Sequence, residues 1–241
     1  MSGGATIRDA AVLVVIDTGR RGTGHDGAPR VLMGRRHGAM AFMANKVVFP
    51  GGRVEAADHR LALPVSLSPR TEAALGHGLS RRAPLTLPRA LALAAIRETA
   101  EEAGALLAHA PECGTGCKTT RSASWRPLLA GGHVPAIDRL HYFARAITPP
   151  GRARRFDTRF FLADASHLAA NAGPAADGEL NDVGWIGFDA ARATDLAPIT
   201  RTVLDEAQAR LSELAKGRMV RPLPFFDNRH GRIKRDWIPA G

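Results

Sequence analysis

The sequence has too few cysteines for a disulfide framework and no apolar run long enough for a membrane span. Its two cysteines, Cys113 and Cys117, stand as C-x3-C in a glycine-rich segment, with no second pair of ligands for a structural zinc ion. No apolar stretch reaches the roughly 18 residues that cross a bilayer. These absences exclude a disulfide scaffold and a transmembrane protein, and they predict a soluble protein of the cytoplasm.

Acidic residues are fewer than basic ones. The chain has 23 Asp and Glu against 33 Lys and Arg, a net charge of +10. This surplus suits an anionic ligand, but arginine is spread through the whole chain, and the basic C-terminal stretch lacks the aromatic interleaving of RNA-binding segments. We therefore expect an anionic small-molecule substrate, and neither a membrane nor nucleic acid as the partner. Whether the chain forms a homodimer is left open.

The 241 residues, 45% of them hydrophobic, are enough for one core with additions. Runs of β-branched and aromatic residues predict strands, and two segments with helix-forming residues predict helices. The predicted strands are 10–17, 30–35, 46–49, 140–146, 158–163 and 183–188, and the predicted helices run from 88 to about 104 and from 199 to 216. This order favours an α/β (α+β) sandwich with a mixed sheet over a doubly wound parallel sheet.

We predict a single domain over residues 1–241 with two additions. The first is a loop or small helical segment at about 59–87, where periodicity fades among scattered prolines and glycines. The second is a basic C-terminal tail at about 218–241, which we expect to dock through Phe225, Phe226 and Trp237.

Three glutamates share one face of the predicted helix that begins near Pro88. At about 100° per residue, Glu98, Glu101 and Glu102 fall within an arc of roughly 100°. A solvated acidic face is the ordinary explanation of such a pattern. However, these anions repel one another and lie near a helix C-terminus, where the macrodipole also disfavours negative charge. A bound divalent cation would relieve both costs, and carboxylate oxygens suit Mg²⁺ or Mn²⁺.

The glutamates belong to a longer motif. Phe49-Pro50-Gly51-Gly52 precedes Asp58 by a short spacer, and Arg97-Glu98-x2-Glu101-Glu102-x-Gly104 follows. This motif resembles the box of the Nudix hydrolases, and the resemblance extends in outline from the first predicted strand to the helix after Trp185. It implies a Nudix-like α/β/α sandwich and metal-dependent cleavage of a phosphoanhydride bond in a nucleoside diphosphate derivative.

The motif departs from the usual Nudix box in three ways. Asp58 stands where the family usually has Glu, and Thr99 stands where a bulky apolar residue is usual. In addition, 38 residues separate Asp58 from Arg97, whereas the usual box has seven. A subgroup similar to the peroxisomal and mitochondrial coenzyme A diphosphatases has such an interrupted box, which implies coenzyme A or acyl-coenzyme A as the substrate. The alternatives are hydrolysis of ADP-ribose, NADH or dinucleoside polyphosphates, and a non-catalytic nucleotide-sensing module.

The resemblance also implies roles for individual residues. Glu98, Glu101 and Glu102 would be catalytic ligands of Mg²⁺ or Mn²⁺, with Glu98 or a nearby carboxylate as general base. Glu179 would supply a further metal-associated acid. Arg97 is expected to pair with a box carboxylate and to hold the helix against the glycine turn. The residues expected to contact the substrate are Gly51, Gly52, Arg36 and Arg155. The insertion is expected to shape the substrate pocket without supplying chemistry.

Overall fold

The structure, a computed structural model, describes residues 6–19, 27–38, 43–111, 120, 122–169, 179–229 and 232–240. Its strands are β1 (Ile7–Asp17), β2 (Arg30–Arg36), β3 (Val47–Val48), β4 (Gly51–Arg53), β5 (Ala108–His109), β6 (Val134–Pro135), β7 (His141–Ile147), β8 (Arg155–Asp164), β9 (Leu180–Gly187), β10 (Leu223–Arg229) and β11 (Arg232–Ile238). Its helices are α1 (Ala56–Arg60), α2 (Pro69–Gly76), α3 (Leu87–Ala103), α4 (Trp125–Leu129), α5 (Phe188–Arg192), α6 (Pro198–Ala209) and α7 (Leu211–Leu214), with short 3₁₀ turns η1 (Ile137–Arg139) and η2 (Ala165–His167).

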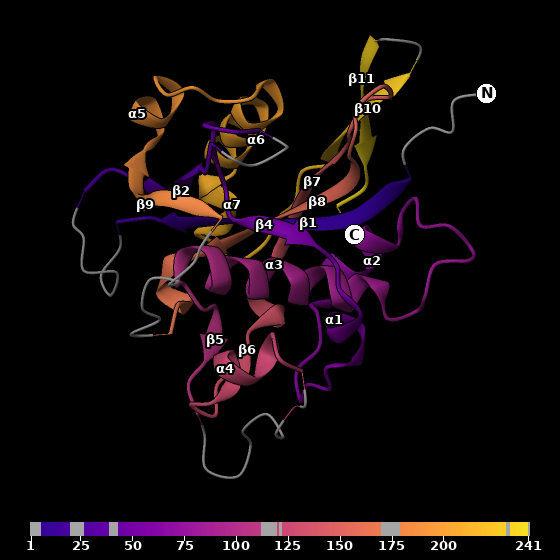
Figure 1. Ribbon diagram of the computed structural model, residues 1–241, viewed down its shortest axis with the longest axis vertical. Helices are drawn as coiled ribbons and strands as arrows, with labels where there is room; N and C mark the ends of the chain where they lie inside the picture. Colours follow the sequence, from indigo (N-terminus) through magenta and orange to yellow (C-terminus); the bar gives the residue numbers. More distant parts are fainter. Residues whose placement is uncertain are drawn as a thin grey trace.

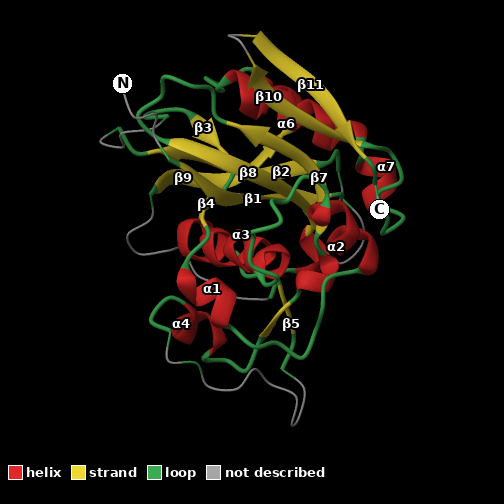
Figure 2. Ribbon diagram, turned by 90° about the vertical axis from the view of Figure 1, so that its right-hand side faces the viewer, coloured by secondary structure: helices red, strands yellow, loops and turns green. Residues whose placement is uncertain are grey.

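A mixed sheet forms the middle layer of the molecule (Figure 1). Its strand order is β11-β10-β7-β8-β1-β2-β3, while β4 also pairs with β1 and β9 also pairs with β2. β1 runs parallel to β8 and antiparallel to β2 and β4. Helices α1, α3 and α4 lie on one side of the sheet, and α6 lies on the other (Figure 2). The predicted α/β/α sandwich with a mixed sheet is confirmed.

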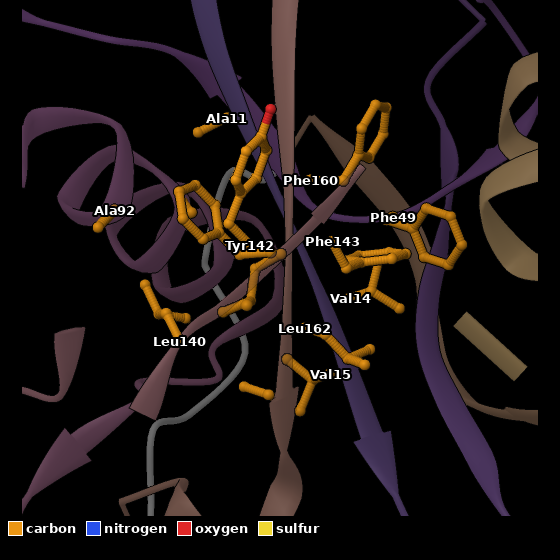
Figure 3. Close-up of a cluster of buried hydrophobic side chains, with 14 of the residues drawn as sticks. Ala11, Val14, Val15, Phe49, Ala92, Leu140, Tyr142, Phe143, Phe160 and Leu162 are labelled. Carbon is orange, nitrogen blue, oxygen red and sulfur yellow. The ribbon is translucent and has the colours of Figure 1, made fainter. Parts of the chain in front are cut away.

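The core has one half on each face of the sheet. Because side chains alternate along a strand, Ala11 and Tyr142 face α3, where Ala92 packs, while Val14 and Phe143 point to the opposite side (Figure 3). All five side chains are buried. Both faces of β1 are therefore covered, which explains why its sequence is an almost continuous apolar run.

Helix α3 has the ends that its sequence predicts. Pro88 lies in the first turn, where its missing N–H costs nothing. Gly104 adopts a left-handed conformation (φ 62°) and its N–H bonds to the Ala100 carbonyl at 3.0 Å. Alanine and leucine between these ends pack the helix tightly on the sheet. Its last two turns, with Arg97 and the three glutamates, consequently lie against β4.

Helix α2 of the insertion packs against α3 and β7. Helix α2 is capped by the Ser68 hydroxyl, which accepts from Thr71 N at 3.2 Å, and the Thr71 hydroxyl donates to the Leu140 carbonyl at 3.0 Å. Arg70 donates to the Met219 carbonyl at 2.5 Å. The predicted small helix is confirmed. These contacts all lie away from the carboxylates. The expectation that the insertion shapes the substrate pocket stays a prediction.

The C-terminal segment is a pair of antiparallel strands that extends the sheet, instead of a docked tail. β10 pairs in parallel with β7, and β11 pairs with β10 along its whole length. Phe226 is buried, but Trp237 on the outermost strand is 57% exposed, so the predicted docking through Trp237 is wrong. Polar residues interrupt the apolar alternation here, which hid the strands in the sequence. No helix within the described ranges is both long and apolar enough to cross a membrane.

Candidate active site

The two glycines of β4 hold two of the glutamates by direct contact. Gly51 N donates to Glu102 Oε2 at 2.9 Å. A Cβ atom on Gly52 would lie 2.4 Å from Glu98 Cδ. On the other side, a Cβ on Gly51 would lie 2.6 Å from the Ala11 carbonyl oxygen. Glycine is therefore required at Gly51, where a Cβ would meet the backbone of β1, and a Cβ at Gly52 would displace the Glu98 carboxylate.

Arg97 is the centre of a buried ionic network. Its Nε and Nη2 donate to the two carboxylate oxygens of Asp58 at 3.0 and 3.1 Å, and its Nη1 donates to Glu98 and Glu101, both at 2.9 Å. Nη2 also donates to the Arg53 carbonyl at 2.9 Å. Asp58 and Arg97 are almost fully buried. The predicted pairing of Arg97 with a box carboxylate is confirmed, and it joins the two halves of the motif across the insertion.

Although burial opposes its charge, the bonds and charges of these carboxylates raise the pKa of Arg97 above its ordinary value. The guanidinium is thus permanently charged. Asp58 also accepts from Trp125 Nε1 at 3.0 Å and from Glu55 N at 2.8 Å. Trp125 was not predicted from the sequence, because the segment around α4 has no periodic signal. Asp58 is therefore satisfied by protein groups alone.

The negative charges of Glu98 and Glu102 are balanced by fewer protein hydrogen bonds than the charge of Asp58. Burial raises the pKa of Glu98 to about 7 against the opposing effect of Arg97, and it raises the pKa of Glu102 to about 8 against the hydrogen bond from Gly51. Glu102 Oε1 is buried and has no hydrogen-bond partner among the described residues. The charges of Glu101 and Glu179 raise the pKa of Glu98 further, and the charges of Glu98 and Glu179 raise that of Glu102. The site therefore has excess negative charge when both groups are ionised.

Glu101 is affected by a different set of carboxylates from Glu98 and Glu102. Burial raises its pKa, Arg97 lowers it, and the charges of Glu55 and Asp58 raise it further. Glu98 and Glu102, in contrast, interact with Glu179. The three glutamates that share one face in a helical projection thus have two different environments.

Arg36 and Glu179 lie at this site as a pair. Arg36 Nη2 donates to Glu179 Oε2 at 2.6 Å, and the charge of Arg36 lowers the pKa of Glu102 while that of Glu179 raises it. The pairing of β2 with β9 brings the two residues together. Both were predicted as site residues, although Arg36 was expected to be open to a substrate phosphate.

The structure does not bring Arg155 to the carboxylates. Arg155 begins β8, level with Ile7 of β1, whereas Gly52 is level with Ala11. Four residues of strand correspond to about 13 Å, and Arg155 Nε donates to the Thr148 carbonyl at 3.1 Å. The basic turn preceding β8 gave no indication of which end of the sheet it would occupy.

The donor atoms at the end of α3 fit a divalent cation only if a ligand completes its coordination. Within the described ranges, no three His, Cys, Asp or Glu side chains form a ready-made metal cluster. Glu98 and Glu102 are nevertheless hard oxygen donors whose charge is only partly compensated, and one oxygen of Glu102 has no partner among the described residues. Mg²⁺ typically uses one or two carboxylates with water and substrate phosphates. This donor set therefore suits Mg²⁺ or Mn²⁺ in an open site.

A cavity of about 770 Å³ lies beside the Arg97 network. It is formed by the segment that connects β4 with α1 and by the residues that precede α4. Its lining residues are Arg53, Val54, Glu55, Ala56, Ala57, Arg60, Leu61, Thr120, Ser122, Ala123 and Ser124. Arg60 and Leu61 are the only two that belong to the insertion.

No protein-family model matches the chain. A Nudix hydrolase from Alicyclobacillus acidocaldarius is similar to it, with a TM-score of 0.60 and 28% identity over 87% of this chain and 97% of that one. A MutT Nudix hydrolase from Burkholderia pseudomallei has a TM-score of 0.44 and 16% identity, covering 83% and 98% of the two chains. The Nudix domain of Shewanella oneidensis NrtR, solved with ADP ribose, has a TM-score of 0.47 and 12% identity, covering 86% and 89%. Only the first similarity is close enough to bear on this chain, and it agrees with a Nudix fold.

Proposed function

We propose that this chain, a Nudix-type hydrolase, uses a divalent cation to cleave the diphosphate linkage of a nucleoside diphosphate derivative, with coenzyme A and its acyl esters as preferred substrates. The observation that carries the proposal is the incomplete compensation of Glu98 and Glu102. Both are held against the glycine backbone of β4, and one Glu102 oxygen has no hydrogen-bond partner among the described residues. A cation with its phosphate ligand would supply the missing positive charge.

Glu98 and Glu102 would hold Mg²⁺ or Mn²⁺, with Glu179 as a further acid and Glu101 in a supporting position beside Arg97. A bound cation would supply a water of lowered pKa and would neutralise charge on the phosphates. Glu98, or a carboxylate next to it, would accept the proton of the attacking water. Arg97 orients Glu98 and Glu101 through Nη1. The Gly51 N–H fixes one oxygen of Glu102 so that the other is free for the cation.

The coenzyme A part of the proposal rests on the interrupted box and on the basic surplus, which suits a substrate with an additional phosphate. Hydrolysis of ADP-ribose, NADH or dinucleoside polyphosphates is the alternative within the same chemistry. A nucleotide-sensing module is the alternative without turnover. The buried carboxylates, whose negative charge is incompletely compensated, favour an enzyme, because a sensor has no need to keep several anions together at an energetic cost.

The test is a substrate panel with Mg²⁺ or Mn²⁺ and products identified by mass. Coenzyme A should give 4′-phosphopantetheine and 3′,5′-ADP, and dephospho-coenzyme A should be the poorer substrate. A higher kcat/KM for ADP-ribose or a dinucleoside polyphosphate would refute the preference for coenzyme A and leave the hydrolase in place. Binding of these compounds without any turnover would instead identify a sensing module.

A further inference from the structure

Two arginines that line the cavity beside the Arg97 network have no anionic partner among the described residues. Arg53 and Arg60 line it, both side chains are exposed, and neither makes an ion pair in the part of the chain that the structure describes. Many other arginines of the described chain do pair with carboxylates, as Arg145 does with Asp157 at 2.6 Å. Two unpaired guanidinium groups facing one hollow are suited to bind an anion, and guanidinium favours phosphate.

The opposite wall of the cavity has hydroxyl groups that can also donate to an anion. Thr120 Oγ1 accepts from Ser122 N at 3.2 Å, and Ser122 Oγ accepts from Trp125 N at 3.3 Å. In these bonds each hydroxyl uses a lone pair, so its own proton can be donated to a ligand. The cavity therefore combines two guanidinium groups with two hydroxyl groups that can donate hydrogen bonds.

Glu55 gives the cavity a different polar group. Its carboxylate accepts from the Ser124 hydroxyl at 3.4 Å and has capacity for further donors. A carboxylate repels a free anion but accepts hydrogen bonds from sugar hydroxyls. The cavity volume of about 770 Å³ also lies within the range of pockets for nucleotide-sized ligands and far exceeds one phosphate. These features together fit a phosphorylated sugar.

The cavity is coupled to the candidate active site through two of its lining residues. The Arg53 carbonyl accepts from Arg97 Nη2 at 2.9 Å, and the charge of Glu55 acts on Glu101. Gly52, which contacts Glu98, immediately precedes Arg53. A ligand in the cavity would thus lie along the same chain segment as a diphosphate at the carboxylates.

We propose that this cavity is a subsite for a phosphorylated ribose of the substrate, in which Arg53 and Arg60 bind a phosphomonoester separate from the diphosphate that is cleaved. The inference rests on the proposed function, since it assigns a place to the extra phosphate of the substrate. Selectivity for a phosphorylated ribose would then be determined outside the carboxylate site.

The experiment compares binding of 3′,5′-ADP and 5′-AMP by calorimetry in the presence of Mg²⁺. Neither compound contains a phosphoanhydride, so no hydrolysis interferes. The variants are Arg53→Gln and Arg60→Gln, with Arg81→Gln as the matched control, because Arg81 is exposed and does not line the cavity. The wild type should bind 3′,5′-ADP at least tenfold more tightly, and each cavity variant should lower this ratio roughly tenfold, as expected for a lost charge-assisted bond. The control should keep the wild-type ratio.

Equal affinities of the wild type for the two compounds, or unchanged ratios in both cavity variants, would overturn the subsite. Should a glutamine variant fail to fold, Arg53→Lys and Arg60→Lys retain the charge and lose the planar fork, and they should keep only part of the preference. The substrate panel is independent of this result. A chain that prefers 3′,5′-ADP but hydrolyses no diphosphate would keep the subsite and lose the proposed activity, and the reverse combination would refute the subsite alone.

Discussion

Two buried charge clusters of this molecule are compensated to different degrees. Around α6 and α7, Arg210 is fully buried and donates to Glu206 at 2.9 Å and to the Pro222 carbonyl at 2.6 Å. Glu213 accepts from Val220 N at 2.8 Å and from the Arg221 side chain. Although burial acts to raise the pKa of Glu213, these bonds and the charge of Arg210 lower it below its ordinary value.

The cluster at the end of α3 shows the opposite balance. Glu98 and Glu102 have pKa values raised to about 7 and about 8 by burial, and a Glu102 oxygen lacks a partner among the described residues. Both clusters pair glutamates with a buried arginine, so the residue types alone do not distinguish them. The difference teaches that a cluster whose charges are matched by the protein stabilises the fold, whereas a cluster left with excess charge is suited to a ligand that supplies the remainder.

The largest expected difference between the clusters is in activity. Glu102→Gln should lower kcat/KM by about a hundred- to a thousandfold, comparable to the loss of one group that stabilises the transition state. It should leave the metal-free fold at least as stable, because it removes an unmatched charge. Glu213→Gln is the matched control and should keep wild-type kcat/KM. Steady-state kinetics and urea unfolding measure both effects, and wild-type turnover by Glu102→Gln would disprove its role.

Within the α3 cluster, Asp58 should behave as a structural group. Asp58→Asn replaces the carboxylate that accepts from Arg97 Nε and Nη2 and from Trp125 by a neutral amide. The buried positive charge of Arg97 then has less negative charge beside it. Breaking a buried ion pair typically costs about 3 kcal/mol or more. Urea unfolding of the metal-free variant should show a loss of this size. An unchanged midpoint would mean that Glu98 and Glu101 alone satisfy Arg97.

In the α6–α7 cluster, Glu213→Gln should destabilise the fold by about 2 kcal/mol, the usual worth of a hydrogen bond to a charged group. The charge of Arg210 would lose one partner, and the Val220 and Arg221 contacts would weaken. The unfolding midpoint in urea measures the loss. A variant as stable as the wild type would show that this cluster is as uncompensated as the other.

A further expected difference is in the pH dependence of stability. The pKa values of Glu98 and Glu102 are raised to about 7 and about 8 in the folded state, so the folded protein binds more protons than the unfolded chain above the ordinary glutamate pKa. With EDTA present, the unfolding free energy should therefore fall as pH rises from about 5 to about 8. The change is spread out because the two groups titrate together. Thermal melts over this range should show a shallower slope in Glu102→Gln, and equal slopes would contradict the excess-charge interpretation.

Local signals in the sequence determined a large part of this structure. Pro88 and Gly104 bound α3, and the apolar run of β1 follows from burial on both faces. The three glutamates on one turn and the preceding Pro50-Gly51-Gly52 indicated both the site and the sandwich that carries it. These features could be predicted because helical periodicity, turn chemistry and burial act over a few consecutive residues.

Tertiary structure decided which of these residues meet. Asp58 reaches Arg97 across 38 intervening residues, and Trp125 completes that contact from a third segment. Strand pairing brings Glu179 to Arg36 and leaves Arg155 at another part of the sheet. The division of the three glutamates between two environments also depends on these distant partners. No local pattern encodes such contacts, because they arise from the order and register of strands that are far apart in the chain.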